Sequence, residues 1–153
     1  MKKIIMAAVV AVAVIAVLFV SWKITAGATT PRETLVTKVI DGDTVVIEGG
    51  EHVRLLGIDT DEKGYPCFDA AKVRLEELIL NKRVTLEQGK EDTDQYGRSL
   101  RWIWLNDTLV NFVMVKEGLA VARFYGDSNY QSEIKAAEAE AIASRTGCKW
   151  SSL

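Results

Sequence analysis

Two short acidic stretches carry the side chains of this sequence that are best suited to bind a cation. The first is DGDT, residues 41–44, which interrupts a run of apolar and β-branched residues, and the second lies in LLGIDTDE, residues 55–62. Asp43 and Asp59 offer hard carboxylate oxygens, which together with backbone carbonyls and water satisfy a Ca²⁺ ion. A cation between them would also offset their mutual repulsion. Because Asp and Gly are frequent in turns, DGD also fits a simple turn without a ligand.

Two arginines and a glutamate extend this chemistry towards phosphate. Displacement at a phosphodiester needs positive charge near the phosphate oxygens and a group that takes a proton from water. The planar guanidinium groups of Arg54 and Arg98 suit a phosphate, and Glu62 can act on the water. Taken singly, each arginine also fits a surface residue or an ion-pair partner, and Glu62 also fits a solvated loop residue.

The first half of the chain predicts strands that would position these side chains. Leu35 to Ile47, the turn EGGEH and then VRLLGI read as a three-strand meander, because apolar and β-branched residues dominate. A helix is predicted over 70–81, with Asp69 as its cap and an apolar stripe that covers one end of a barrel or sheet. RVTLEQ reads as a fourth strand and GKEDTDQYGR as an exposed polar loop.

The second half completes the predicted fold. SLRWIWL reads as a fifth strand, with Trp102 and Trp104 on one face and assigned to the core. A short helix ended by Gly118 follows, then an extended LAVARF, and then a helix capped near Ser128 or Asn129 and stopped by Gly147. Five strands with three helices suit an α+β fold built on a small closed barrel of the oligonucleotide-binding type.

The N-terminal 28 residues are set apart from this domain. Two lysines precede an uncharged run from Ile4 to Trp22, which is typical of an export signal or a membrane anchor. Ala26 to Ala28 offers a cleavage site, whereas Trp22 and Lys23 resemble an interfacial anchor, so both readings stay open. Either one predicts an extracytoplasmic protein, secreted or held by its N-terminal helix. We expect a segment 1–28, a linker 29–34, a domain 35–150 and a tail 151–153.

The net charge narrows the range of possible functions, and the cysteine content indicates a disulfide. Without Lys2, Lys3 and Lys23, 16 of the 19 basic side chains remain against 21 acidic ones, a net charge of about −5. That balance counts against a tight, sequence-independent nucleic-acid binder and favours an enzyme that turns its substrate over. Cys67 and Cys148 are the only cysteines, and outside the cytoplasm such a pair is a candidate disulfide between the C-terminal tail and the body.

Four motifs in one order resemble the thermonuclease family, the staphylococcal-nuclease-like domains. They are VIDGDTVVI, RLLGIDTDE, DQYGRSL and VNFVMVKEGLA, and the resemblance runs from about Leu35 to Trp150. It implies a five-stranded oligonucleotide-binding barrel with three helices. It also implies a Ca²⁺-dependent nuclease that acts on single-stranded DNA and RNA and leaves 3′-phosphate ends. We expect a monomer.

The resemblance also implies roles for single residues. Asp43 and Asp59 would hold calcium together with the backbone carbonyl of Thr60. Arg54 would bind the scissile phosphate, and Arg98 would stabilise its developing charge or the leaving 5′-oxygen.

Three further positions follow from the same resemblance. Glu62 would orient or deprotonate the attacking water. Tyr96 occupies the family's YGR position, and Phe124 or Tyr125 lies where the family places an aromatic against a base, although core packing also fits Phe124.

Two departures from the family pattern affect the same region. The family commonly has proline where this chain has Asp61, which frees the backbone and adds a negative charge near the predicted cation. The segment KGYPCF also shortens a loop that is lysine-rich in some members. The alternative function is a non-catalytic barrel that binds nucleic acid or protein, but such relatives usually lose the acidic or arginine positions, and this chain keeps all five.

Overall fold

The computed structural model describes residues 31–151 of the 153-residue chain. The predicted signal or anchor over 1–28 therefore lies outside the described residues, as do positions 29, 30, 152 and 153. Within 31–151, no helix combines the length and the apolar character needed to cross a bilayer.

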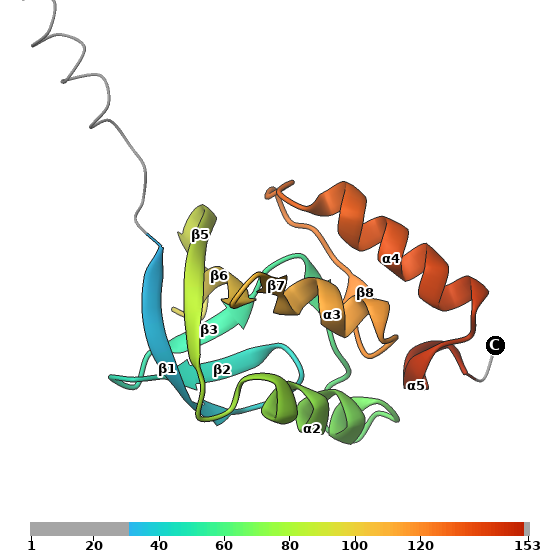
Figure 1. The fold of residues 1–153 in the computed structure, drawn as a ribbon, viewed down its shortest axis with the longest axis horizontal. Helices are drawn as coiled ribbons and strands as arrows, with labels where there is room; N and C mark the ends of the chain where they lie inside the picture. Colours follow the sequence, from blue (N-terminus) through green and yellow to red (C-terminus); the bar gives the residue numbers. More distant parts are fainter. Residues whose placement is uncertain (1–30, 152–153) are drawn as a thin grey trace, which may run out of the picture. The chain divides into compact units, whose positions relative to one another are not determined.

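Five strands form a closed barrel (Figure 1). β1 (Arg32–Val39), β2 (Thr44–Ile47) and β3 (His52–Leu55) make an antiparallel meander. β5 (Arg83–Thr93) pairs with β1 and with β6 (Ser99–Leu105), and β3 runs parallel to β6 to close the barrel. The predicted α+β fold with a five-stranded barrel is confirmed, while the predicted N-terminal hydrophobic helix falls outside the described residues.

The barrel interior is filled by apolar residues of these strands. Val45, Ile47 and Val53 have no exposed surface, and neither has Trp102. Trp104 is partly buried and packs against the same core. Both tryptophans therefore pack in or against the core, as predicted, but the predicted alternating burial along SLRWIWL was wrong, because the neighbours Trp102 and Ile103 are both fully buried.

Three short strands lie outside the barrel's main pairing. β7 (Thr108–Leu109) continues the sheet beyond β6, and β4 (Ile58–Asp59) pairs with β8 (Val121–Ala122). In the second pair Asp59 lies opposite Val121. The residues after β8 are thereby brought next to the second acidic stretch.

The first helix, α2 (Phe68–Ile79), covers one end of the barrel (Figure 1). It buries Ala71, Leu75 and Ile79, which form the apolar stripe that the sequence predicts. The predicted boundaries were wrong, because the helix begins two residues earlier and Asp69 lies in its first turn. Cys67 is the N-cap residue and makes no side-chain cap hydrogen bond; its N–H is bound by a carboxylate from the preceding loop.

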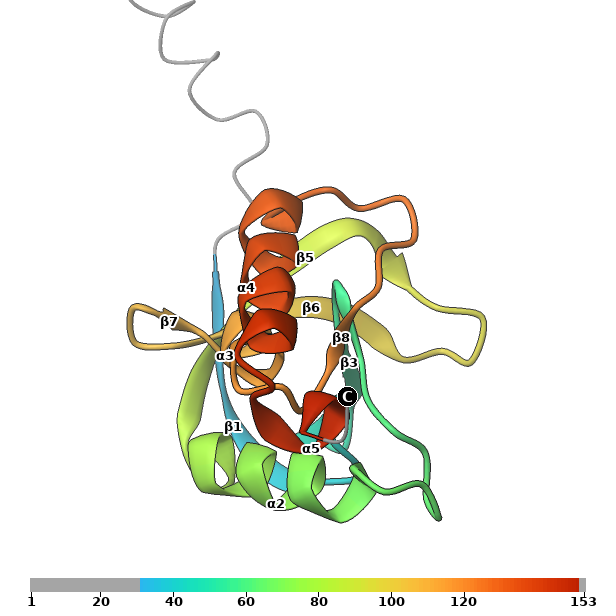
Figure 2. The same ribbon diagram turned by 90° about the vertical axis from the view of Figure 1, so that its right-hand side faces the viewer.

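The remaining helices pack on the barrel side (Figure 2). α3 (Val110–Lys116) lies against β6, and α4 (Gln131–Ala143) packs on α3. The predicted last helix is corrected at both ends, since it begins at Gln131 rather than near 128 or 129 and ends before Gly147. Arg145 has a positive φ of 51°, which ends α4, and α5 (Gly147–Trp150) is a separate short helix.

The predicted polar loop 89–98 is also corrected. β5 continues through Thr93, which pairs with Ser99, so only Asp94 to Arg98 form the connecting turn. This extension has polar residues on both faces, and its pairing with β6 rather than an apolar pattern makes it a strand.

Candidate active site

The first acidic stretch forms a tight turn between β1 and β2 that buries Asp43. The Asp41 carboxylate accepts the backbone N–H of Asp43 at 3.0 Å, an interaction typical of such turns. A Cβ on Gly42 would lie 2.6 Å from the Cβ of Ala71 and 2.8 Å from Thr60 Cγ2. Glycine is therefore needed here, because the turn packs directly against α2 and the second acidic stretch.

Asp43 is held from several directions. Its Oδ2 accepts hydrogen bonds from the N–H and the hydroxyl of Thr60, both at 2.9 Å, and its Oδ1 accepts one from the Thr44 hydroxyl at 3.1 Å. Burial raises the pKa of this carboxyl, and the nearby Arg54 offsets only part of the effect, so the pKa lies above its ordinary value.

Arg54 bridges the two carboxylates that the sequence predicts as cation ligands. Its Nε lies 3.1 Å from Asp43 Oδ1, and its Nη2 lies 3.0 Å from Asp59 Oδ1. Its Nη1 donates to the Leu55 carbonyl at 2.6 Å, which fixes the plane of the guanidinium. In the described structure, this guanidinium offsets the repulsion between the two acids.

Arg98 reaches the same network from the β5–β6 turn. Its Nη1 donates to the Thr44 hydroxyl at 3.3 Å, and that hydroxyl donates to Asp43. Its Nε pairs with Asp94 Oδ2 at 2.7 Å, while Asp94 Oδ1 accepts the N–H groups of Tyr96 and Arg98. Burial raises the pKa of Asp94, but these hydrogen bonds outweigh it and hold the pKa below its ordinary value.

A cavity of about 630 Å³ collects most of the predicted site residues on its walls. The predicted residues that line it are Arg54, Asp59, Arg98, Tyr96 and Phe124. Asp43 and Thr60 lie behind the wall, hydrogen-bonded to each other. Glu62 is exposed, on the loop that follows Thr60, and is not part of the cavity wall.

The cavity wall also includes Arg123, which sequence reasoning did not single out. Arg123 lies within 3.5 Å of Asp59 Oδ2 and over the ring of Tyr125, 5.9 Å from its centroid. Arg98 lies over Tyr96 in the same way, at 5.5 Å. Tyr96 and Tyr125 are 76% and 78% exposed, so each is free to meet a ligand. A repeated pairing of arginine with tyrosine, in DQYGR and ARFY, is the signal that could have found Arg123.

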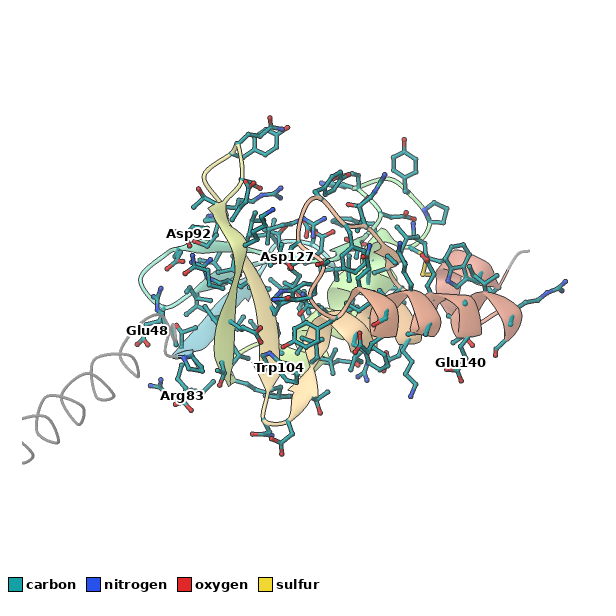
Figure 3. All side chains as sticks on the ribbon, turned by 90° about the horizontal axis from the view of Figure 1, so that it is seen from above. Glu48, Arg83, Asp92, Trp104, Asp127 and Glu140 are labelled. Atoms are coloured by element: carbon teal, nitrogen blue, oxygen red, sulfur yellow. A yellow bond between two sulfur atoms is a disulfide. The ribbon has the colours of Figure 1, made fainter. Side chains whose placement is uncertain are left out.

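Phe124 and Asp127 support this wall of the cavity. Phe124 packs against the core, with its ring centroid 6.4 Å from that of Trp102, so the core reading left open by the sequence describes it well. Asp127 accepts the N–H of Lys90 at 2.8 Å and that of Asn129 at 2.9 Å. Figure 3 labels Asp127 between the strands and the start of α4. It therefore ties the segment that carries Arg123 to β5.

The donor chemistry of the site fits a hard divalent cation. Asp43 and Asp59 both lie within 3.1 Å of the Arg54 guanidinium, so the two carboxylates are close together, with Arg54 between them. Two carboxylates with a backbone carbonyl and water are a typical Ca²⁺ environment. Among residues 31–151, however, no cluster of three His, Cys, Asp or Glu side chains is arranged as a ready metal site.

Cys67 and Cys148 form a disulfide, with Cα atoms 5.5 Å apart and a separation of 81 positions in sequence. It is the pairing that the sequence indicates, and it links the start of α2 to α5.

Comparison with known proteins identifies the family to which this barrel and its arginine–carboxylate cavity belong. Residues 52–152, more than half of the chain, match the family described as "Staphylococcal nuclease homologue". The chain belongs to the staphylococcal nuclease family, which confirms the resemblance, and it is accordingly an enzyme of the nuclease, or phosphodiesterase, type.

Individual relatives agree with this assignment. The thermonuclease of Staphylococcus intermedius is 41% identical over 117 residues, 70% of each chain. The thermonuclease of Staphylococcus hyicus is 33% identical over 92% of this chain and 94% of its own length. The micrococcal nuclease of Shigella flexneri is 33% identical over 76% of this chain and 72% of its own length.

Proposed function

We propose that the protein is a Ca²⁺-dependent nuclease that hydrolyses DNA and RNA and leaves 3′-phosphate ends. The observation that supports this most strongly is the convergence of Arg54 and Arg98 on one cavity. Arg54 contacts Asp43 directly, and Arg98 contacts it through the Thr44 hydroxyl. Two guanidinium groups beside two carboxylates suit a phosphate that must be held and neutralised while its bond breaks.

The guanidinium groups of the two arginines are held by different numbers of partners, and we infer different tasks for them. Arg54 uses three of its five N–H groups on Asp43, Asp59 and Leu55, so it is fixed and offers its remaining donors in one orientation. Arg98 has one strong partner, Asp94, and a longer contact to Thr44. We assign Arg54 to holding the scissile phosphate and Arg98 to stabilising the charge that develops on it.

Hydrolysis then needs two proton transfers, one from the attacking water and one to the leaving oxygen. Water attacks the phosphorus and the bond to the 5′-oxygen breaks; that oxygen takes a proton from solvent water and leaves as the 5′-hydroxyl, so the phosphate stays on the 3′ side. Glu62 takes the proton of the attacking water, which it afterwards returns to solvent, or orients that water. Asp43, Asp59 and the carbonyl of Thr60 would hold Ca²⁺, which when bound supplies positive charge to the phosphate oxygens.

Aromatic side chains from two separate segments of the cavity wall would bind the bases. Tyr96 projects from the β5–β6 turn and Tyr125 from the segment after β8, and both are exposed. Stacking on such rings is available to unpaired bases of any sequence, which favours single-stranded DNA and RNA. Phe124, which is partly buried and packs near Trp102, would support this wall of the cavity rather than carry the stacking alone.

The test is hydrolysis of labelled single-stranded DNA and RNA by the purified protein, with Ca²⁺ or with a chelator. We expect cleavage only with Ca²⁺, and fragments whose 3′ ends accept a label only after a phosphatase removes the phosphate. Cleavage that persists with the chelator, or fragments with 5′-phosphate ends, would contradict the proposal.

We also propose that the enzyme works outside the cytoplasm as a monomer. The disulfide supports the location outside the cytoplasm, because such bonds persist in oxidising compartments. The apolar N-terminal run would act as an export signal or as an anchor in the membrane. Cell fractionation tests the location, and full-size protein recovered in the cytoplasm would contradict it. Size-exclusion chromatography tests the monomer.

A further inference from the structure

The loop that carries Glu62 has few internal contacts that would hold it in place. This Glu62 loop, residues 60–66, runs from β4 to α2, and positions 62–66 are all exposed. A single backbone hydrogen bond, from the Tyr65 N–H to the Glu62 carbonyl at 3.0 Å, links residues within it. Neither a strand partner nor a buried apolar side chain fixes residues 62–66. The position of Glu62 must therefore depend on the two ends of the loop.

Asp61 anchors the first end. Its side chain is only 16% exposed, and its Oδ2 accepts the N–H of Cys67 at 2.9 Å, so it spans the loop. Its Oδ1 pairs with the Nζ of Lys149 on α5. The family commonly has proline at this position, which could make neither contact.

The disulfide anchors the second end. Cys67 is the N-cap residue of α2, it is almost fully buried, and its sulfur is bonded to Cys148 of α5. Two consecutive residues of α5, Cys148 and Lys149, thus hold both ends of the Glu62 loop. We call these two links, Asp61–Lys149 and Cys67–Cys148, the C-terminal clasp.

The helix that holds the loop is itself fixed to the body of the protein. The Lys149 N–H donates to the Gly118 carbonyl at 3.1 Å. A Cβ on Gly147 would lie 2.2 Å from the Glu117 carbonyl oxygen, so the start of α5 is in close contact with the end of α3. Figure 2 shows α5 beside the loop that leads into α2. The two links of the clasp therefore connect the Glu62 loop, through α5, to the end of α3.

We propose that the C-terminal clasp positions Glu62 for the hydrolysis of phosphodiesters, with Asp61, Lys149 and the disulfide as positioning residues. This rests on the role proposed above for Glu62. The substrate-binding arginines lie on or beside barrel strands and have no contact with the clasp. Loosening the clasp should therefore slow turnover and leave substrate binding nearly unchanged.

The experiment compares kcat and KM on single-stranded DNA for the full-length protein and its variants, at saturating Ca²⁺. Asp61→Asn and Lys149→Met remove the ion pair, and a Cys67→Ser/Cys148→Ser variant removes the covalent link. We expect kcat to fall about tenfold, a part of the 10²–10⁴-fold that a positioned base supplies, and KM to stay within about twofold. If the cysteine variant does not fold, Lys149→Met still decides the question.

Arg74→Met is the matched control. Arg74 pairs with Glu117 at 2.7 Å, so this variant also breaks an ion pair between α2 and the end of α3, but one that does not touch the Glu62 loop. We expect it to lower the melting temperature without lowering kcat. An equal loss of kcat in Arg74→Met and Lys149→Met would overturn the proposal, because general destabilisation would then explain both.

A double-mutant cycle with Glu62→Gln separates the clasp from the proposed function. If Glu62→Gln alone leaves kcat unchanged, the assigned role of Glu62 fails and the clasp proposal fails with it. If Glu62→Gln slows turnover, Lys149→Met should add little in that background, because the group it positions is gone. Fully additive effects, or unchanged kcat in Lys149→Met alone, would overturn the clasp while leaving the nuclease proposal intact.

Discussion

The cavity wall and the Glu62 loop are held in place by different kinds of structure. Arg54 lies on β3 and is fixed by two carboxylates and a carbonyl, and Arg98 lies where β6 begins. Glu62 lies on an exposed loop whose ends are tied to α5. The charges that would hold the substrate thus depend on the barrel, whereas the group that would act on water depends on the last helix. Damage to the Glu62 loop should therefore lower kcat alone, whereas loss of Arg54 from the cavity wall should also destabilise the fold.

The largest effect is expected from Arg54→Met, which removes the charge shared by Asp43 and Asp59. Leaving a buried carboxylate unpaired typically costs about 3–5 kcal/mol, and we expect the lower end because Asp59 is partly exposed. Activity should be lost as well. Urea unfolding measures the stability, and Ca²⁺ should restore part of it, since the ion would bind only the folded state. A stability loss no greater than that of Arg74→Met, which breaks a partly exposed pair, would contradict the shared-charge interpretation.

A smaller but specific effect is expected from Glu62→Gln. The substitution keeps size and polarity but removes the proton acceptor, so kcat should fall about 10²-fold while KM and melting temperature stay nearly constant. Steady-state kinetics on single-stranded DNA measure this. A change in KM without a change in kcat would place Glu62 among the binding residues instead.

Arg123→Ala should weaken substrate binding several-fold and leave kcat nearly unchanged. Arg123 is about half exposed and makes only a 3.5 Å contact with Asp59, so its charge is available to a phosphate next to the scissile one. Each phosphate contact also adds to the salt dependence of binding. KM measured at several salt concentrations should therefore show a shallower dependence in the variant. An unchanged KM at every concentration would remove Arg123 from the binding surface.

The smallest effect is expected from Asp94→Asn on stability at different pH values. The folded pKa of Asp94 is below its ordinary value of 3.8, so the folded state favours the ionised form. Its contribution is present above that ordinary value and is lost as pH falls through the folded pKa. We expect the variant to be about 1 kcal/mol less stable at pH 7, with the difference vanishing in strong acid. A difference that persists unchanged in acid would contradict this cause.

Much of the fold could be predicted because its strands follow local patterns. Runs of β-branched and apolar residues mark β1, β2, β3 and β6, and these fill the barrel as predicted. The end of β5 could not be predicted in this way, since its polar residues are extended only through pairing with β6. The start of α2 was missed because the carboxylate that binds its N-cap N–H comes from Asp61, six residues earlier.

The site was predictable residue by residue but not in its contacts. The motifs supplied Arg54, Asp59 and Arg98, and the structure brings these three to one cavity. The guanidinium bridge between the carboxylates depends on the register of the β2–β3 hairpin, in which Thr44 lies opposite Arg54, and residue patterns alone do not fix that register. Arg123 was missed because β4 and β8, which bring it beside Asp59, have two residues each and show no periodicity.

The central claim is that the cavity bounded by Arg54 and Arg98 is where the phosphodiester is broken. Its most direct test is single-turnover hydrolysis of single-stranded DNA by Arg98→Ala and the unmodified protein, both saturated with Ca²⁺ and substrate. The account predicts a rate lower by about 10²–10³-fold, or about 3 kcal/mol, in a variant that remains folded. A folded Arg98→Ala protein that cleaves at the unmodified rate would contradict it.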